Sequence, residues 1–303
     1  CVMDIYNGDV VAMVSSPTYD PNEFVHGIKS KSWQELINHR DRPLTNKAIA
    51  GLYPPGSTIK TIVALSTLEN DIANTKKKVL CKGSIELYGE KFHCWKKKGH
   101  GWMDMRSAIK KSCDVYFYEI ARRLGVDKLS VTAKQFGLGK ATFNGFLEER
   151  SGVVPNTKWK KKYIGKNWYL GETLHSGIGQ GYYLATPMQL CLMTAQLANG
   201  GYEIFPRIII DENRNNNLRE YINYINENPH DTSGLVLAKY GVNKLFTNQE
   251  NINFVKDAMF AATNEAGGTS FRSRYNDQKF MFAGKTGSSQ IKKFTELQRE
   301  LEI

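Results

Sequence analysis

A serine and a lysine stand three positions apart at the start of an apolar segment. Ser57 and Lys60 follow Tyr-Pro-Pro-Gly at positions 53–56, and the chain continues as Thr-Ile-Val-Ala-Leu at 61–65. This pattern predicts a helix over about 57–69, in which positions three apart lie on the same face. A serine hydroxyl is a weak nucleophile and needs a base within hydrogen-bond reach, and a neutral lysine can be that base. We therefore expect Ser57 to be a nucleophile and Lys60 its proton acceptor.

Two later segments supply the other groups that such chemistry needs. They are Ser112-Cys113-Asp114 and Lys285-Thr286-Gly287. Burial and the neighbouring charge of Lys285 would favour the neutral amine of Lys60. Ser112 is expected to relay a proton between Lys60 and a leaving amine, and Asp114 to orient this network.

The last motif is also expected to bind substrate. Lys285 and Thr286, on an edge strand, would bind a carboxylate, and Gly287 leaves room for the substrate to approach. The backbone N–H groups of Ser57 and Ser288 would form an oxyanion hole.

The order of these motifs resembles that of penicillin-binding proteins and serine β-lactamases. Longer segments narrow the resemblance to the transpeptidase domain of class B penicillin-binding proteins, closest to those of the rod-shape elongation system. Asp114 stands where the wider superfamily usually has Asn, and elongation-type members often carry Asp. The segments that carry the resemblance are Ser15-Ser16-Pro17, Asn46-Lys47-Ala48-Ile49, Gly51-Leu52-Tyr53-Pro54-Pro55-Gly56-Ser57, Gly99-His100-Gly101, Glu149-Arg150-Ser151-Gly152, Gly177-Ile178-Gly179-Gln180-Gly181 and Ala185-Thr186-Pro187-Met188-Gln189.

This resemblance implies an α+β fold of the penicillin-binding protein and serine β-lactamase type, with an antiparallel sheet flanked by helices and an all-helical subdomain. It implies a peptidoglycan D,D-transpeptidase that cross-links stem peptides through an acyl-enzyme on Ser57, in lateral wall synthesis and cell-shape maintenance. β-Lactams would acylate the same serine, and catalysis would need no cofactor. The implied partners are D-Ala-D-Ala stem peptides, a shape-elongation glycosyltransferase and a scaffold protein. An N-terminal anchor outside this chain would hold the enzyme at the bacterial inner membrane, with its catalytic domain in the periplasm.

We interpret residues 1–303 as one transpeptidase domain, partial at both ends. The chain begins with Cys1, and only 16 residues follow Gly287, where the family continues with strands and a closing helix. No apolar run approaches the roughly 20 residues that span a bilayer. The net charge of +11 is assigned to a solvated basic face, with attraction to an anionic membrane surface or acidic polymer as the alternative. No pattern of a nucleic-acid-binding module appears.

Local patterns predict several further elements. Residues 2–14 are expected to form a hairpin with a two-residue turn at Asn7-Gly8. Helices are expected at about 105–124, closed by Gly125, at 187–198, with Thr186 as the cap, and at about 250–265. Residues 280–284 are expected to form a buried strand. Residues 75–113 are interpreted as a loop-rich subdomain, and residues 211–231 as an Asn-rich surface insertion.

Three cysteines and a histidine fall within that loop-rich subdomain. Cys81, Cys94, His100 and Cys113 offer a Cys3His set, which is a common closed tetrahedral zinc site. Such a metal would tie the subdomain to the second motif. Some elongation-type relatives place a structural zinc here with two Asp, one His and one Cys, and the resemblance puts Cys81 and Cys94 where those aspartates stand. A Cys81–Cys94 disulfide, favoured by an oxidising periplasm, and free thiols are the alternatives.

Other functions are compatible with parts of the pattern. A serine β-lactamase shares the three motifs, but the class A form needs a Glu four residues before an Asn, whereas Glu148 and Glu149 precede Gly152 and Val153 at that spacing. A D,D-carboxypeptidase would use water as the acceptor, and a β-lactam sensor would be acylated once and then signal. A purely structural zinc module would leave penicillin labelling independent of Ser57.

Overall fold

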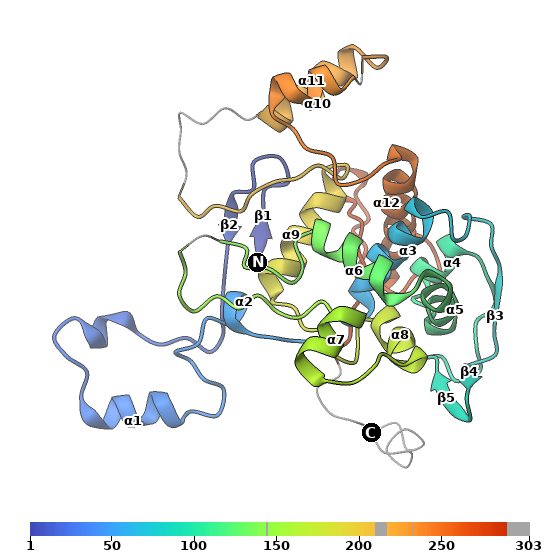
Figure 1. Cartoon of the computed structure of the whole chain (residues 1–303). Helices are drawn as coiled ribbons and strands as arrows, with labels where there is room; N and C mark the ends of the chain where they lie inside the picture. The colour runs from blue at the N-terminus through green and yellow to red at the C-terminus, as the bar shows by residue number, and fades with distance from the viewer. Residues whose placement is uncertain (144, 210–216, 232, 290–303) are drawn as a thin grey trace. The chain divides into compact units, whose positions relative to one another are not determined.

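The computed structural model describes residues 1–143, 145–209, 217–231 and 233–289 (Figure 1). The chain divides into two compact units that alternate along the sequence. The first unit contains Cys1–Leu52, Phe136–Gly152 and Ala185–Leu245. The second unit contains Tyr53–Gln135, Val153–Leu184 and Phe246 onward. All residues of the three predicted motifs belong to the second unit.

The first unit begins with a short antiparallel pair, β1 (Val2–Met3) and β2 (Val10–Ala12). The predicted hairpin is confirmed, but the two-residue turn is wrong. The connection runs over residues 4–9 because the carboxylate of Asp4 accepts hydrogen bonds from the backbone N–H groups of Tyr6, at 2.8 Å, and Asn7, at 3.2 Å. These bonds stabilise a wider loop. The helices of this unit are α1 (Ser30–Asn38), α2 (Lys47–Ala50), α9 (Pro187–Ala198), α10 (Asn217–Glu227) and α11 (Gly234–Tyr240), with a 3-10 helix at Pro21–Phe24.

Helix α9 is the helix predicted at 187–198. Thr186 caps it, Pro187 takes its first position, and the side-chain oxygen of Gln189 accepts a hydrogen bond from the Thr186 N–H at 2.9 Å. The buried Gln189 amide also donates to the carbonyl groups of Lys140 and Ser151, at 2.7 and 2.8 Å. The helix packs against β1 and α2.

The second unit is built around helix α3 (Lys60–Glu69), which a 3-10 turn at Gly56–Ile59 introduces. The predicted helix at 57–69 is therefore confirmed. Residues 60–68 are all buried, because α4, α5, α6 and α12 pack around α3. A helix surrounded in this way needs apolar residues on every side, which explains the continuous apolar run in the sequence. The surrounding helices are α4 (Met105–Lys110), α5 (Asp114–Leu124), α6 (Val126–Gln135), α7 (Thr157–Ile164), α8 (Leu170–Gly177) and α12 (Gln249–Asn264).

The single helix predicted at 105–124 is wrong. Helix α4 ends at Lys110 and α5 begins at Asp114, and between them Ser112 has a φ of +53°. A left-handed residue cannot continue a right-handed helix, so the second motif forms a turn between two helices. The predicted stop at Gly125 is confirmed by its φ of +79°.

The segment before α4 is more regular than its sequence predicted. It contains two antiparallel pairs, β3 (Val79–Cys81) with β6 (Gly101–Met103) and β4 (Ser84–Leu87) with β5 (Glu90–His93). The interpretation as a loop-rich segment missed these strands, because three or four residues are too few to show a period-2 pattern.

The strand predicted at 280–284 is wrong. A 3-10 turn occupies Gln278–Phe280, and residues 281–289 have no strand partner among the described residues. The side chains of Phe280, Met281 and Phe282 are exposed. A strand is defined by its hydrogen-bonded neighbour, so an apolar run without one remains an extended segment. Of the predicted surface insertion at 211–231, residues 211–216 lie outside the described residues and 217–227 form α10.

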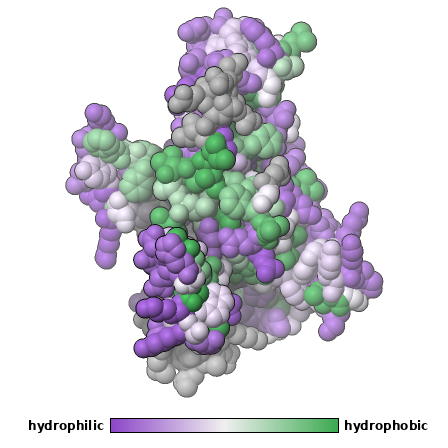
Figure 2. Space-filling model, turned by 90° about the vertical axis from the view of Figure 1, so that its left-hand side faces the viewer, coloured by the Kyte–Doolittle hydropathy of each residue, from purple (hydrophilic) through white to green (hydrophobic). Residues whose placement is uncertain are grey.

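The α+β class is confirmed by this mixture of helices and small antiparallel pairs. Hydrophilic residues cover most of the face in Figure 2, around a smaller hydrophobic group, in keeping with the net charge of +11. Among the described helices, none combines the length and apolar character needed to cross a bilayer.

Candidate active site and metal cluster

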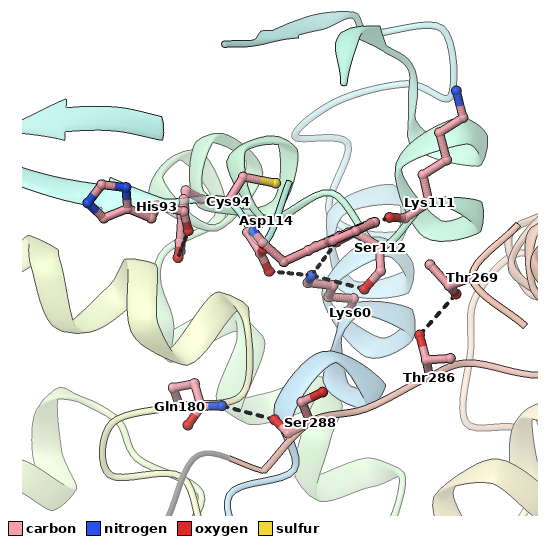
Figure 3. A network of polar contacts seen from close by, with 12 residues as sticks. Lys60, His93, Cys94, Lys111, Ser112, Asp114, Gln180, Thr269, Thr286 and Ser288 are labelled. Atoms are coloured by element: carbon pink, nitrogen blue, oxygen red, sulfur yellow. Dashed lines mark hydrogen bonds and ion pairs between the residues drawn. The ribbon is translucent and has the colours of Figure 1, made fainter. Parts of the chain in front are cut away.

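Lys60, in the first turn of α3, is a buried cation with three acceptors. Its Nζ donates to Asp114 Oδ1 at 2.6 Å, to the Ser112 carbonyl at 3.0 Å and to Ser112 Oγ at 3.3 Å. An ammonium group has three N–H donors, so these contacts account for all of them. The side chain is 0% exposed and lies over the ring of Phe117. Figure 3 shows Lys60, Ser112 and Asp114 converging from α3 and the turn before α5.

Lys285 reaches the same hydroxyl from the third motif. Its Nζ donates to Ser112 Oγ at 2.8 Å and to the Thr286 carbonyl at 3.0 Å. The Ser112 hydroxyl therefore lies between the amines of Lys60 and Lys285. Burial, and secondly the charge of Lys60, hold the pKa of Lys285 well below its usual range, and Asp114 opposes this shift. The sequence predicts a charged Lys285 beside Lys60, whereas the environment of Lys285 favours its neutral amine.

Ser57 lies in the 3-10 turn that introduces α3, one turn before Lys60. None of the hydrogen bonds among the described residues uses its hydroxyl, so the predicted Ser57–Lys60 bond is not formed here. Catalytic hydrogen bonds are often long in a free enzyme and shorten when substrate binds. The pair nevertheless starts the helix as predicted.

Three glycines let separate backbone segments meet beside Ser57. Gly56, with a φ of +57°, accepts no side chain, because a Cβ there would lie 2.3 Å from the Ser288 carbonyl oxygen. A Cβ on Gly287 would lie 2.8 Å from the Thr58 side chain, and one on Gly179 would lie 2.2 Å from the Gly56 carbonyl oxygen. The backbone around Ser288 thus lies next to Ser57, where both N–H groups were expected to act.

Two polar contacts hold the third motif in place. Thr286 donates to the hydroxyl of Thr269 at 2.9 Å, and the amide of Gln180 donates to the Ser288 carbonyl at 3.2 Å (Figure 3). Sequence reasoning missed both partners as site residues. Gln180 stood inside the Gly-Ile-Gly-Gln-Gly segment, which was the signal available, whereas nothing marked Thr269.

Asp114 has a second partner that the sequence did not indicate. Its Oδ2 accepts a hydrogen bond from the backbone N–H of Trp95 at 2.8 Å, while Oδ1 binds Lys60. The indole Nε1 of Trp95 also donates to the carbonyls of Ser112, at 3.0 Å, and Lys111, at 3.2 Å. The residue that follows Cys94 therefore contacts the second motif directly.

The four predicted metal ligands lie together, and one of them, Cys113, belongs to the turn between α4 and α5. One ligand atom from each of Cys81, Cys94, His100 and Cys113 lies within 4.8 Å of all the others. His100 Nδ1 is 3.6 Å from the Cys81 sulfur and 3.5 Å from the Cys94 sulfur. Around a zinc ion with bonds of about 2.3 Å to sulfur and 2.0–2.1 Å to nitrogen, tetrahedral angles separate the two ligand atoms by roughly 3.6 Å. The spacing fits such an ion.

Two of the four ligands, Cys94 and His100, have pKa values shifted toward the form that binds a metal, whereas that of Cys113 is shifted toward the thiol. A hydrogen bond from the Cys113 thiol lowers the pKa of Cys94 to about 5, against the opposing effects of burial and of Asp114. Donating that bond, together with burial, raises the pKa of Cys113. Burial lowers the pKa of His100 and so favours the neutral imidazole. Thiolate and neutral imidazole are the forms that bind zinc. All five cysteines, each among the described residues, are free thiols.

Known proteins resemble this chain over nearly its whole length. The family model for the penicillin binding protein transpeptidase domain matches residues 1–299. The peptidoglycan D,D-transpeptidase MrdA of Escherichia coli (strain K12) is 34% identical over 293 residues, which cover 96% of this chain and 44% of that protein. MrdA of Salmonella typhimurium (strain SL1344) gives the same identity over 292 residues, again covering 96% of this chain and 44% of that protein. The chain thus spans less than half the length of these relatives.

Solved structures give the same result. Pseudomonas aeruginosa PBP2 in complex with WCK 5153 is 35% identical with a TM-score of 0.80, over 95% of this chain and 62% of that chain. Helicobacter pylori PBP2 in complex with MreC is 31% identical with a TM-score of 0.82, over 95% of this chain and 50% of that chain. Since the family model and these structures cover nearly the whole chain, it belongs to the penicillin-binding protein transpeptidase family.

Proposed function

We propose that this chain is the catalytic part of a peptidoglycan D,D-transpeptidase of the PBP2 type, with Ser57 as its nucleophile. One observation carries the proposal: the hydroxyl of Ser112 lies between two lysine amines, 3.3 Å from Lys60 Nζ and 2.8 Å from Lys285 Nζ. Two amines that share one hydroxyl form a path for a proton, from the buried Lys60 to the half-buried Lys285. Because this path ends at Lys60, it reaches the helix turn that presents Ser57.

The path explains how Lys60 becomes a base. With all three of its protons bound, Lys60 must first release one, and Ser112 Oγ can pass it to the neutral amine of Lys285. A substrate carboxylate bound at Lys285 would favour the charged form there, since opposite charges stabilise each other. Substrate binding would thereby leave Lys60 neutral.

Acylation of Ser57 then proceeds through a tetrahedral intermediate. Ser57 Oγ bonds to the carbonyl carbon of the penultimate D-Ala, and its proton moves to Lys60. The tetrahedral intermediate collapses as the C–N bond breaks, and the amine of the leaving D-Ala takes a proton through Ser112. An amine of a second stem peptide attacks the ester by the reverse sequence and restores the Ser57 hydroxyl. The N–H groups of Ser57 and Ser288 would stabilise the oxyanion in both halves of the reaction.

Intact-mass spectrometry after exposure to a penicillin tests this proposal. We expect one covalent adduct, mapped to Ser57 by peptide analysis, and no adduct in a Ser57→Ala variant. Ser66→Ala serves as the matched control, because Ser66 is a buried serine of the same helix whose hydroxyl bonds elsewhere. An adduct on any other residue, or labelling that survives in Ser57→Ala, contradicts the assignment.

We further propose that Cys81, Cys94, His100 and Cys113 bind a structural zinc ion. The 3.5–3.6 Å spacing of His100 to two sulfurs, the burial of the three cysteines and the lowered pKa of Cys94 support this ligand set. Four protein ligands leave no open position for water, so the ion would stabilise the fold and take no part in the chemistry.

Metal analysis of the purified protein tests the zinc proposal. We expect one equivalent of zinc, lost in Cys94→Ser and kept in Cys191→Ser, a cysteine outside the cluster. A Cys81–Cys94 disulfide in metal-free wild-type protein would support the alternative instead.

The relatives suggest where and with what this enzyme acts. One matched structure is a PBP2–MreC complex, and another is described as a peptidoglycan synthase complex that coordinates polymerization and crosslinking, at 28% identity and a TM-score of 0.68. We propose that this chain likewise works with a scaffold protein and a glycosyltransferase, in the periplasm and held at the inner membrane. Co-purification with these two partners is the corresponding test.

A further inference from the structure

Trp95 connects the catalytic turn to the Cys/His cluster. It directly follows the cluster ligand Cys94, and its ring lies edge-on to the imidazole of His100, with ring centroids 5.2 Å apart. Its backbone N–H and its indole N–H both point the other way, toward Asp114 and Ser112. One residue therefore contacts both sites.

Burial does not hold this side chain in place. The Trp95 side chain is 59% exposed, yet its indole nitrogen is shared between the carbonyls of Ser112 and Lys111. An exposed indole could turn its N–H to water without cost in hydrogen bonds. The indole N–H nevertheless bonds to the turn, so this orientation of the Trp95 side chain is a specific feature of the structure.

The bond fixes the peptide group that matters most for the proton path. The Ser112 carbonyl accepts from Lys60 Nζ and from Trp95 Nε1, at 3.0 Å each, which fills both of its lone-pair positions. This peptide group joins Ser112 to the cluster ligand Cys113. Holding this peptide group also holds the backbone of Ser112, which has a left-handed φ of +53° and carries the hydroxyl of the proton path.

We propose that Trp95 is a positioning residue for acylation: its two N–H groups hold Ser112 and Asp114 in the geometry of the proton path, and its ring makes that geometry depend on the Cys/His cluster. The proposal rests on the proposed function of Ser57. It adds a residue that acts on the proton path through the turn.

Trp102 provides a matched control within the same region. It is 64% exposed, lies two residues after His100, and belongs to β6 opposite Leu80. Among the described residues, its indole makes no hydrogen bond to the catalytic turn. If Trp95 only covers the cluster, Trp95→Phe and Trp102→Phe should behave alike.

Stopped-flow acylation by a chromogenic cephalosporin separates the binding constant of the noncovalent complex from the rate constant of acylation. We expect Trp95→Phe to lower the acylation rate constant about tenfold, in line with the loss of one hydrogen bond to a buried carbonyl. In Trp95→Phe, the binding constant, the zinc content and the melting temperature should stay at wild-type values. Trp102→Phe should change neither these three quantities nor the acylation rate constant. A wild-type rate constant in Trp95→Phe overturns the proposal.

Coupling to the cluster has its own test. Cys81→Ser should slow acylation in the wild-type background and have little further effect in Trp95→Phe, because both changes release the same peptide group. Fully additive effects would refute the coupling.

If Trp95→Phe loses zinc or unfolds, benzothienylalanine at position 95 is the second variant. It keeps the ring shape and removes only the N–H, and its acylation rate constant decides the question. Penicillin labelling at Ser57 is recorded in every variant, so a failure of the proposed nucleophile is seen separately.

Discussion

Ser112 combines an essential hydroxyl with an unfavourable backbone. Its φ of +53° puts a side chain in the left-handed region, which costs non-glycine residues about 1–2 kcal/mol. The surrounding bonds from Lys60, Lys285 and Trp95 hold it there. Strain of this kind persists at sites where function requires one geometry.

The strain predicts different stabilities for two substitutions of Ser112. Ser112→Gly and Ser112→Ala both remove the hydroxyl, so both should lose penicillin labelling. Glycine relieves the left-handed strain and alanine keeps it, so the glycine variant should be more stable by about 1 kcal/mol in urea-induced unfolding. Equal stabilities would show that the turn carries no strain at this position.

Lys285 should make stability depend on pH in a defined direction. Burial and the charge of Lys60 lower its pKa in the folded chain, so between that value and the unfolded value of about 10.4 the unfolded chain binds more protons. The contribution of this lysine to stability therefore rises with pH across that window. We expect the free energy of unfolding of wild type minus that of Lys285→Met to increase as the pH rises from the lowered pKa of Lys285 toward about 10.4. A difference that falls with pH would place the shift in the other direction.

At this scale, sequence reasoning found the groups with distinctive chemistry and missed those that act through the backbone. Lys60, Ser112, Asp114 and Lys285 come together as predicted. Trp95 was not predicted as a site residue. Its backbone N–H is a group that any residue type supplies, and its indole N–H bonds to backbone carbonyls, which no sequence motif marks. The spacing in the sequence pairs Lys60 with Ser57, whereas in the structure Lys60 bonds to Ser112. That choice depends on tertiary geometry, which the spacing of residues does not encode.

Helix α8 shows how an element outside the motifs supports the site. Its N-terminal Glu172 accepts hydrogen bonds from the Tyr169 N–H, at 2.8 Å, and from the fully buried ammonium of Lys160. Lys160 also lies over the ring of Tyr169, 4.6 Å from its centroid. The other end of α8 leads directly into Gly179, whose carbonyl accepts from the Gly56 N–H at 2.9 Å. The Lys160–Glu172 pair thus anchors the helix that supports the turn of Ser57.

Glu172→Gln tests this anchor. It leaves the buried Lys160 charge without its counter-charge, and removing one partner of a buried pair costs about 3–5 kcal/mol. Because Glu172 is 22% exposed, we expect a loss nearer 2–3 kcal/mol in the free energy of unfolding. The control change Arg122→Gln removes an exposed arginine from Glu119, which keeps its pair with Arg123, and should cost less than about 0.5 kcal/mol. Similar losses in the two variants would argue against the anchor.

Elements with local signals were the predictable ones. Helices α3, α9 and α12 carried caps, glycine stops or apolar runs, and all three are confirmed. The predictions failed where partners decide the structure: the apolar run at 280–284 has no neighbouring strand among the described residues, and the pairs β3–β6 and β4–β5 are too short to recognise. The helix break at Ser112 was missed because a serine in the sequence does not indicate a positive φ.

At the scale of the molecule, the cluster joins two kinds of structure within the second unit. Cys81 ends β3, Cys94 follows β5, and Cys113 directly precedes α5. The small strand pairs between residues 79 and 103 bury few apolar side chains of their own, Phe92 and Met103 among them. A metal would therefore supply much of the stability of this segment.

Metal removal should act locally. After chelation, amide hydrogen exchange should accelerate in residues 79–103 and stay unchanged in α9, which belongs to the first unit. Mass spectrometry of peptides with and without chelator measures both. Exchange that accelerates equally in α9 would mean that the ion stabilises the chain as a whole.

The turn between α4 and α5 has a consequence for how this protein can change. Three consecutive side chains there have three different roles: Ser112 contacts the two lysines, Cys113 belongs to the Cys/His cluster, and Asp114 pairs with Lys60. A substitution that repelled an antibiotic at one of them would also disturb the other two. We therefore expect drug-resistant descendants to keep this tripeptide intact and to acquire their changes in the surrounding loops.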